Sequence, residues 1–120
     1  MQAIENLRLQ AFETIRADVP ELLEWMQDMN WPVGSGICEY LSPHVNKIKE
    51  DLLNILNSSD DLWKLWIISS LIANSQIRHK IKLDRELILK IKSIADRPTA
   101  GETEQGVDIA AKELISDYKW

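Results

Sequence analysis

The sequence is poor in the residues that support covalent or metal-based chemistry. Among its 120 residues there is one cysteine, Cys38, so neither an intrachain disulfide nor a cysteine metal cluster can form. His44 and His79 have no histidine or cysteine partner at metal-ligand spacing, and we expect both at the surface. Cys38 lies among apolar residues and is expected to be a small buried side chain. We therefore expect no catalytic residue, no cofactor and no metal, and a protein that is not an enzyme.

Targeting and phosphate-binding signals are also scarce. Residues 1–10 have no basic segment followed by an apolar run, which argues against a secretory signal. Gly34-Ser35-Gly36 lacks the long loop and the lysine of a phosphate-binding loop. We expect a cytoplasmic protein without a membrane segment. Its 45% hydrophobic and 28% charged residues are typical of one globular domain, spanning residues 1–120.

Positive charge is scarce overall and unevenly distributed. The formal net charge is -5, which does not favour general nucleic-acid binding. Residues 1–63 contain four Lys or Arg against eleven Asp or Glu, a net of -7, whereas residues 78–97 contain seven against three, a net of +4. The basic segment has two interpretations, a solvated helix face or a docking site for an acidic partner.

One stretch organises the remainder of the chain. Wound as a helix, Ser59 to Ser75 carries apolar side chains on nearly every side and leaves only a narrow polar lane with Asp60, Lys64 and Ser75. Such a helix must be buried by neighbours on several sides. Asp60 and Asp61 stand where a helix N-terminus favours negative charge. We predict a central helix with Trp66 in the core.

Further helices are predicted around it from apolar spacing and capping residues. Before the central helix we predict an amphipathic helix over 3–17, then a helix that starts at Asp18 and Glu21 with capping-box spacing and carries Leu22, Leu23, Trp25, Met26 and Met29, and then a turn over 30–36. A short helix with Ile37, Cys38, Tyr40 and Leu41 follows, and Ser42 and Pro43 open another with the stripe Val45, Ile48, Leu52 and Ile55. After the central helix we predict a long or twice-started helix over 77–95 with Asp84 as an internal cap, a loop over 96–101 and a last helix over about 102–118. No segment shows strand-like alternation bounded by turns.

Three parts of the chain share a helix-turn-helix plan. Leu22 and Leu23 precede Trp31 by about as much as Leu52 and Leu53 precede Trp63, and a third copy covers 87–114 with a longer loop. A spacing of roughly 30 to 35 residues with two helices each is typical of stacked helical repeats. The predicted fold is all-α, a short HEAT-like stack of antiparallel helical hairpins with about six to seven helices.

An ordered string of motifs resembles the bacterial domain of unknown function 5071 family. It comprises Pro20-Glu21-Leu22-Leu23-Glu24-Trp25, then Asp28-Met29-Asn30-Trp31-Pro32-Val33, then Trp63-Lys64-Leu65-Trp66 running into Ile68-Ser69-Ser70-Leu71, and Ile94-Ala95-Asp96 with Pro98-Thr99, Glu102, Val107-Asp108 and Ala110. The resemblance covers residues 18–115; residues 1–17 show no match, and Gly106 replaces an expected charged helix former. It implies a small HEAT-like helical domain and carries over no catalytic or binding residue.

Tryptophan is the abundant aromatic, with five residues. Trp31 and Trp63 occupy equivalent corners between helices, where they either wedge hairpins together or form exposed anchors for a partner. Two functional hypotheses follow. The first is a protein-interaction module, in its concrete form immunity- or antitoxin-like, that masks a basic partner near Trp31, Trp63 and Lys64. The alternative is a nucleic-acid-binding helical repeat that uses the basic segment 78–92. Oligomeric state, partner and process stay open.

Overall fold

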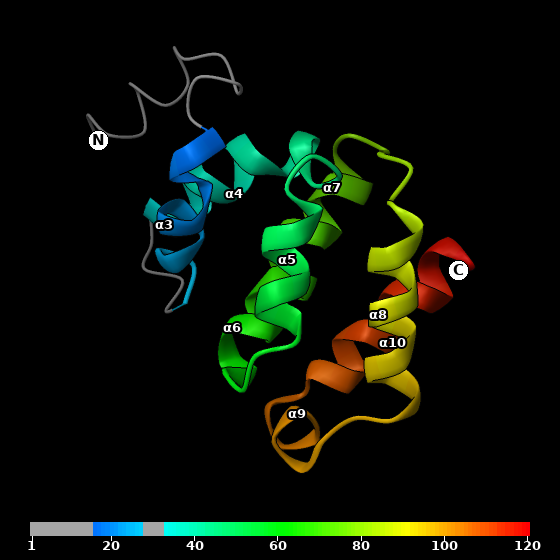
Figure 1. Ribbon diagram of the computed structural model, residues 1–120. Coiled ribbons are helices and arrows are strands. Elements are labelled where there is room, and N and C mark those ends of the chain that lie inside the picture. The colour runs from blue at the N-terminus through cyan, green and yellow to red at the C-terminus, as the bar shows by residue number, and fades with distance from the viewer. Residues whose placement is uncertain (1–15, 28–32) are drawn as a thin grey trace.

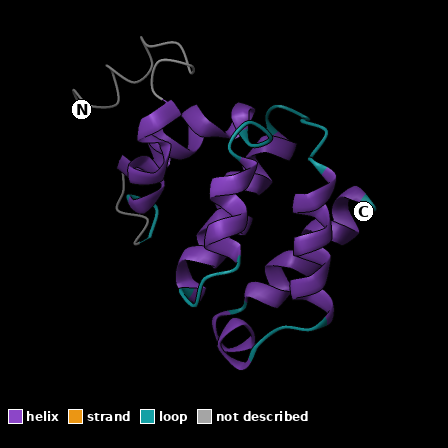
Figure 2. Cartoon of the chain, viewed as in Figure 1, coloured by secondary structure: helices purple, strands orange, loops and turns teal. Residues whose placement is uncertain are grey.

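The computed structural model describes residues 16–27 and 33–120, and these contain helices, turns and loops without a strand (Figure 2). The predicted all-α class is confirmed for this part of the chain. The helix predicted over 3–17 lies almost wholly outside the described residues. None of the helices within them combines the length and the apolar character needed to cross a bilayer.

The elements follow one another closely along the chain. They are the 3-10 turn η1 (Arg16–Asp18), α3 (Val19–Glu24), α4 (Val33–Leu41), the 3-10 turn η2 (Ser42–His44), α5 (Lys49–Leu56), α6 (Asp61–Trp66), the π-helix η3 (Ile67–Ile72), α7 (Ala73–Ile77), α8 (Arg85–Asp96), α9 (Ala100–Gln105) and α10 (Val107–Tyr118). Figure 1 shows α5 and α8 side by side, with α10 packed against α8 and α6 leading through η3 into α7 behind α5.

The predicted central helix is α6, η3 and α7 read as one continuous rod. Its middle is the core of the molecule, because Ile67, Ile68, Leu71 and Ile72 are all completely buried. The rod is not equally covered on every side. Trp66, expected in the core, is only half-buried, and Leu62 one turn earlier on the same side is exposed. The sides of the rod that carry these four residues are therefore packed in the core, and the side that carries Leu62 and Trp66 is partly exposed to solvent.

Three local predictions for the first half are wrong. Asp18 does not cap α3 with its side chain, because η1 runs directly into α3 and keeps Asp18 in a helical backbone conformation from which a cap cannot reach. Residues 33–36 belong to α4 and not to a turn, since burial of Ile37, Cys38 and Leu41 offsets a glycine penalty of about 1 kcal/mol each. Ser42 opens no long helix: its buried hydroxyl donates to the Glu39 carbonyl at 3.2 Å, and α5 starts only at Lys49.

The second half follows the predicted pattern more closely. Asp84 caps α8 as expected, accepting a hydrogen bond from the Glu86 N–H at 2.9 Å. The loop before it is fixed by Asn46, whose amide donates to the Lys82 carbonyl at 2.8 Å and accepts from the Asp84 N–H at 2.7 Å. One apolar assignment in each half is also wrong, because Trp25 in the first half and Ile77 in the second are 48% and 68% exposed.

The last predicted helix is two helices. Gly106 separates α9 from α10 with φ +78°, in the left-handed region, and this conformation ends α9 and starts α10. Glycine adopts it without the steric cost that a Cβ brings. The position where the sequence departs from the expected charged helix former is therefore the position where the backbone turns.

Replacing Gly106 by alanine tests this backbone constraint. A Cβ at Gly106 meets no atom within 4 Å, so the expected loss comes from the left-handed conformation alone. We expect Gly106→Ala to lower the free energy of unfolding by about 1–2 kcal/mol in urea denaturation. Gly106→Asn is the matched control and should lose less, since asparagine tolerates this region. Equal stability of the alanine variant and the native chain would contradict the assignment.

Candidate functional site

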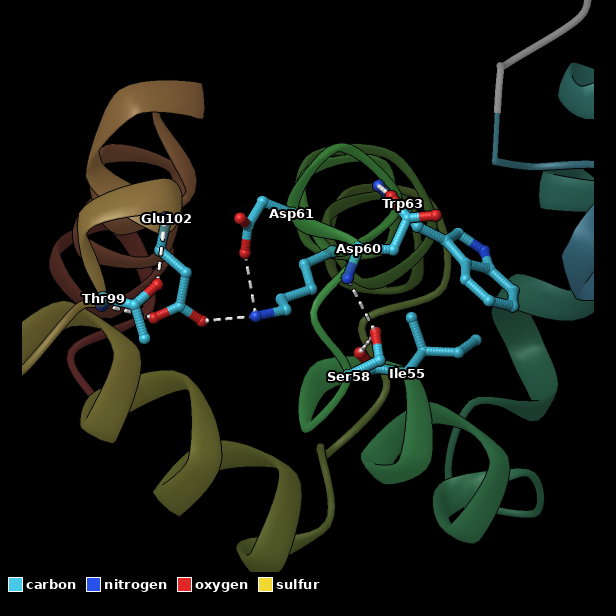
Figure 3. A network of polar contacts seen from close by, with 8 residues as sticks. Ile55, Ser58, Asp60, Asp61, Trp63, Thr99 and Glu102 are labelled. Carbon is cyan, nitrogen blue, oxygen red and sulfur yellow. Dashed lines mark hydrogen bonds and ion pairs between the residues drawn. The ribbon is translucent and has the colours of Figure 1, made fainter.

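Helix α6 directs polar and aromatic side chains to opposite sides of the rod. In Figure 3 the carboxylates of Asp61 and Glu102 are joined by dashed lines to the same ammonium nitrogen, whereas Trp63 points to the other side, where Ile55 and Ser58 lie. The helix start is fixed by Asp60, whose carboxylate accepts from the Trp63 N–H at 3.1 Å. The two sides of α6 therefore have different chemistry, an ion-pair network on one and a groove on the other.

The network on the first side is built around a buried lysine. Lys64 is 4% exposed, and its Nζ lies 3.0 Å from Asp61 Oδ1 and 3.0 Å from Glu102 Oε2. Glu102, equally buried, also forms a capping box with Thr99: Glu102 Oε1 accepts from the Thr99 N–H at 2.8 Å, and Thr99 Oγ1 accepts from the Glu102 N–H at 3.1 Å. Gly101 packs directly against the Asp61 carboxylate. These contacts fix α9 against α6.

The protonation states of the network follow from the same contacts. Burial by itself lowers the pKa of Lys64, but the hydrogen bonds to Asp61 and Glu102 outweigh it and leave that pKa above its ordinary value. For Glu102, burial raises the pKa, while the Thr99 N–H and the Lys64 ammonium outweigh burial and leave it lowered. Both groups are therefore charged near neutral pH, and Lys64 serves to join helices.

Lys64 is one of the three residues expected near a protein-binding surface, and the structure places its side chain inside the buried network. Its partner Glu102 is 38 residues further along the chain, so spacing gives no signal for the pair. The capping-box spacing Thr99-x-x-Glu102 is the sequence signal that indicates a structural role for Glu102, at the start of a helix.

The groove on the second side lies between α3, α5 and α6. It has a volume of about 200 Å³ and is lined by Pro20, Leu23, Glu24, Asp51, Asn54, Ile55, Ser58 and Trp63. Trp63 is half-buried, and its indole N–H donates to the Leu23 carbonyl at 3.0 Å. Trp63 therefore joins α6 to α3, as the wedge interpretation requires, and also lines the groove. Trp31, its expected counterpart, lies outside the described residues.

The groove combines an apolar floor with an acidic rim. Leu23 and Ile55 are buried beneath it, while Glu24 is exposed on α3 and Asp51 half-buried on α5. Among the described residues, no lysine or arginine forms an ion pair with either carboxylate. Lysine and arginine side chains have an apolar stem and a charged end. The groove therefore matches a cationic side chain. Glu24 and Asp51 could not be paired from the sequence, because they come together only as lining residues of this groove.

The remaining candidate residues show no reactive arrangement. Cys38 is buried as predicted, and burial raises the pKa of its thiol to about 11, which keeps it protonated. His79 is exposed, and His44 is half-buried with its ring centroid 5.9 Å from that of Tyr40. Within the described residues no group of three or more His, Cys, Asp or Glu is placed to hold a metal ion.

Removing one member of the network should be strongly destabilising. Lys64→Met leaves Glu102 buried without its counter-ion, so we expect a loss of about 3–5 kcal/mol in the free energy of unfolding. Adding Glu102→Gln should restore part of this, because glutamine keeps the capping box without the buried charge. Lys92→Met, at an exposed lysine of α8, is the control and should change stability by less than about 0.5 kcal/mol. Equal effects of Lys64→Met and Lys92→Met would contradict a structural role for the network.

The network should also give stability a characteristic pH dependence. The folded-state pKa of Glu102 lies below its ordinary value of 4.5, so its contribution is complete above that value and is lost as pH falls through the folded pKa. The pKa of Lys64 lies above 10.5, so its contribution is complete below that value and is lost as pH rises through the folded pKa. Urea denaturation of the native chain and Glu102→Gln should give curves that converge in acid. A difference between them that does not change with pH would show that Glu102 is not coupled to Lys64.

Comparison with known protein families identifies a match over nearly the whole chain. The family described as "Domain of unknown function (DUF5071)" matches residues 1–115, so the expectation that residues 1–17 fall outside the resemblance is wrong. Comparisons with curated proteins and with solved structures found no match. The family match includes both sides of α6, the buried lysine network and the acidic groove. Because it covers nearly the whole sequence, the chain belongs to the family of the domain of unknown function 5071.

Proposed function

We propose that the chain is a non-enzymatic protein-interaction module that docks a cationic partner protein in the groove between α3, α5 and α6. The observation that carries this proposal is the pair of carboxylates, Glu24 and Asp51, at a groove floored by Leu23 and Ile55. A lysine or arginine of the partner packs its stem on that floor and places its charge beside the carboxylates. Trp63 supplies a rigid aromatic wall of the kind enriched at binding hot spots.

The net charge of the surrounding segment also supports a cationic partner. The groove lies within residues 1–63, which carry a net charge of -7. Exposed Glu21 on α3 and exposed Glu50 on α5 add acidic groups to the helices that form its walls. A field of one sign attracts a partner of the opposite sign and raises the association rate. The partner class is therefore a basic protein.

The concrete form of the proposal is an immunity- or antitoxin-like protein that masks a basic partner. Small size and acidity support it, and masking requires a surface rather than a reaction. A HEAT-like stack of hairpins is proposed as the architecture behind that surface, since stacked helical pairs present extended ridges.

Nucleic-acid binding through residues 78–92 is the second candidate. Exposed Lys80, Lys82, Arg85 and Lys92 favour it. Against it, Arg78 pairs with Glu39 at 2.8 Å, and Asp84 and Glu86 in the same segment pair with Lys49. Binding through phosphates would weaken steeply with salt. A gel-shift series with DNA and RNA at low salt tests it.

Charge reversal at the groove distinguishes specific docking from general acidity. Glu24→Lys/Asp51→Lys changes the groove, and Glu113→Lys/Asp117→Lys makes the same change in net charge at exposed positions of α10. The probe is a fluorescent peptide that alternates arginine with leucine, with a citrulline version as the neutral control. We expect the native chain and the α10 variant to bind it and the groove variant to lose about tenfold or more in affinity, equivalent to 1.4 kcal/mol. Equal losses in both variants, or equal binding of the citrulline peptide, would overturn the proposal.

A further inference from the structure

A second hollow lies farther along the central rod. It has a volume of about 260 Å³ and is formed where η3 and α7 face the last turns of α4. Its polar lining comes from Glu39, Ser69, Ser70, Asn74 and Arg78, and its apolar lining from Cys38, Ala73 and Ile77. It shares no lining residue with the acidic groove, so any ligand here is independent of the proposed docking function.

The wall that η3 and α7 contribute to the hollow carries hydroxyl and amide groups that can still hydrogen-bond a ligand. The Ser69 hydroxyl donates to the Leu65 carbonyl at 2.7 Å, which leaves its oxygen lone pairs to accept. The Ser70 hydroxyl has no hydrogen-bond partner among the described residues. Both serines belong to the π-helix, a conformation that is rare and often found at functional sites. Asn74 is held by its amide donating to the buried Ser42 hydroxyl at 3.1 Å, with its own oxygen left to accept.

The polar end of the hollow presents both signs of charge. Arg78 Nη1 lies 2.8 Å from Glu39 Oε1, and the two side chains are 59% and 44% exposed. An ion pair this exposed contributes about 0–1 kcal/mol, so a ligand that supplies replacement charges separates it at little cost. A simple anion placed at Arg78 would meet the Glu39 carboxylate, and a simple cation at Glu39 would meet the guanidinium.

We propose that this hollow binds a small zwitterion of the amino-acid type. Its carboxylate pairs with Arg78 and its ammonium with Glu39, while the hydroxyl of Ser70 and the oxygen of Asn74 hydrogen-bond the polar atoms between them. The remainder of the ligand lies against Ala73 and Ile77. Its volume of about 260 Å³ lies just below the roughly 300–1,000 Å³ of sites for drug-sized ligands, which favours a ligand smaller than a drug molecule.

Amide chemical shifts measured by NMR test the proposal. The probes are the individual common L-amino acids at millimolar concentration, with succinate as a dianion and putrescine as a dication. We expect at least one amino acid to shift the amides of Ser69, Ser70, Asn74 and Arg78, and neither control probe to do so. No shift with any amino acid would overturn the proposal, as would equal shifts with succinate or putrescine.

Variants locate the binding and separate it from the groove. Arg78→Gln removes the carboxylate partner at an exposed position, and Ser70→Ala removes one hydroxyl; we expect affinity to fall about tenfold and severalfold, respectively. Lys92→Gln on α8 and Glu24→Lys/Asp51→Lys at the groove should leave amino-acid binding unchanged. Undiminished binding to Arg78→Gln would overturn the assignment, whatever the outcome of the peptide experiment.

Discussion

The buried ammonium of Lys64 is the constraint on which the arrangement of the helices depends. Removing such an ion from water costs several kcal/mol unless carboxylates and hydrogen bonds replace its hydration. Asp61 is on the same helix, but Glu102 comes from α9, so burial of Lys64 requires α9 to dock. Once Lys64 faces α9, the helical rotation of about 100° per residue points Trp63 elsewhere, toward α3. The ion pair thereby determines which side of α6 is left for the groove (Figure 3).

The features predicted correctly from sequence are those set by neighbouring residues. The buried middle of the central rod and the stripe from Val45 to Ile55 are marked by the spacing of apolar residues, and the Asp60 and Asp84 caps are contacts within three residues. Both kinds of feature leave a local signal in the sequence. The Ser69 hydroxyl is likewise bonded locally, to the Leu65 carbonyl one turn back.

The errors occur where tertiary contacts override local preference. Ser42 followed by proline reads as a helix start, yet its hydroxyl is buried against α4 and α7, where it bonds to Glu39 and Asn74. Glycines near the start of α4 read as a turn, yet a buried apolar face keeps them helical. The acidic groove could not be predicted for the same reason, because Glu24 and Asp51 belong to helices whose packing no spacing rule specifies.

The two proposed sites lie at different points along the rod formed by α6, η3 and α7, and the helical geometry of the rod differs between them. Near its start the backbone is a regular, capped α-helix, and the Trp63 ring forms a firm wall that suits a protein side chain. Farther along, the π-helix brings two serines to a hollow beside Asn74 and Arg78. Between the two, Ile67 and Ile68 are completely buried, so the core separates the sites. A ligand in one site therefore influences the other only by shifting packed core side chains, and the simplest expectation is that the sites act independently.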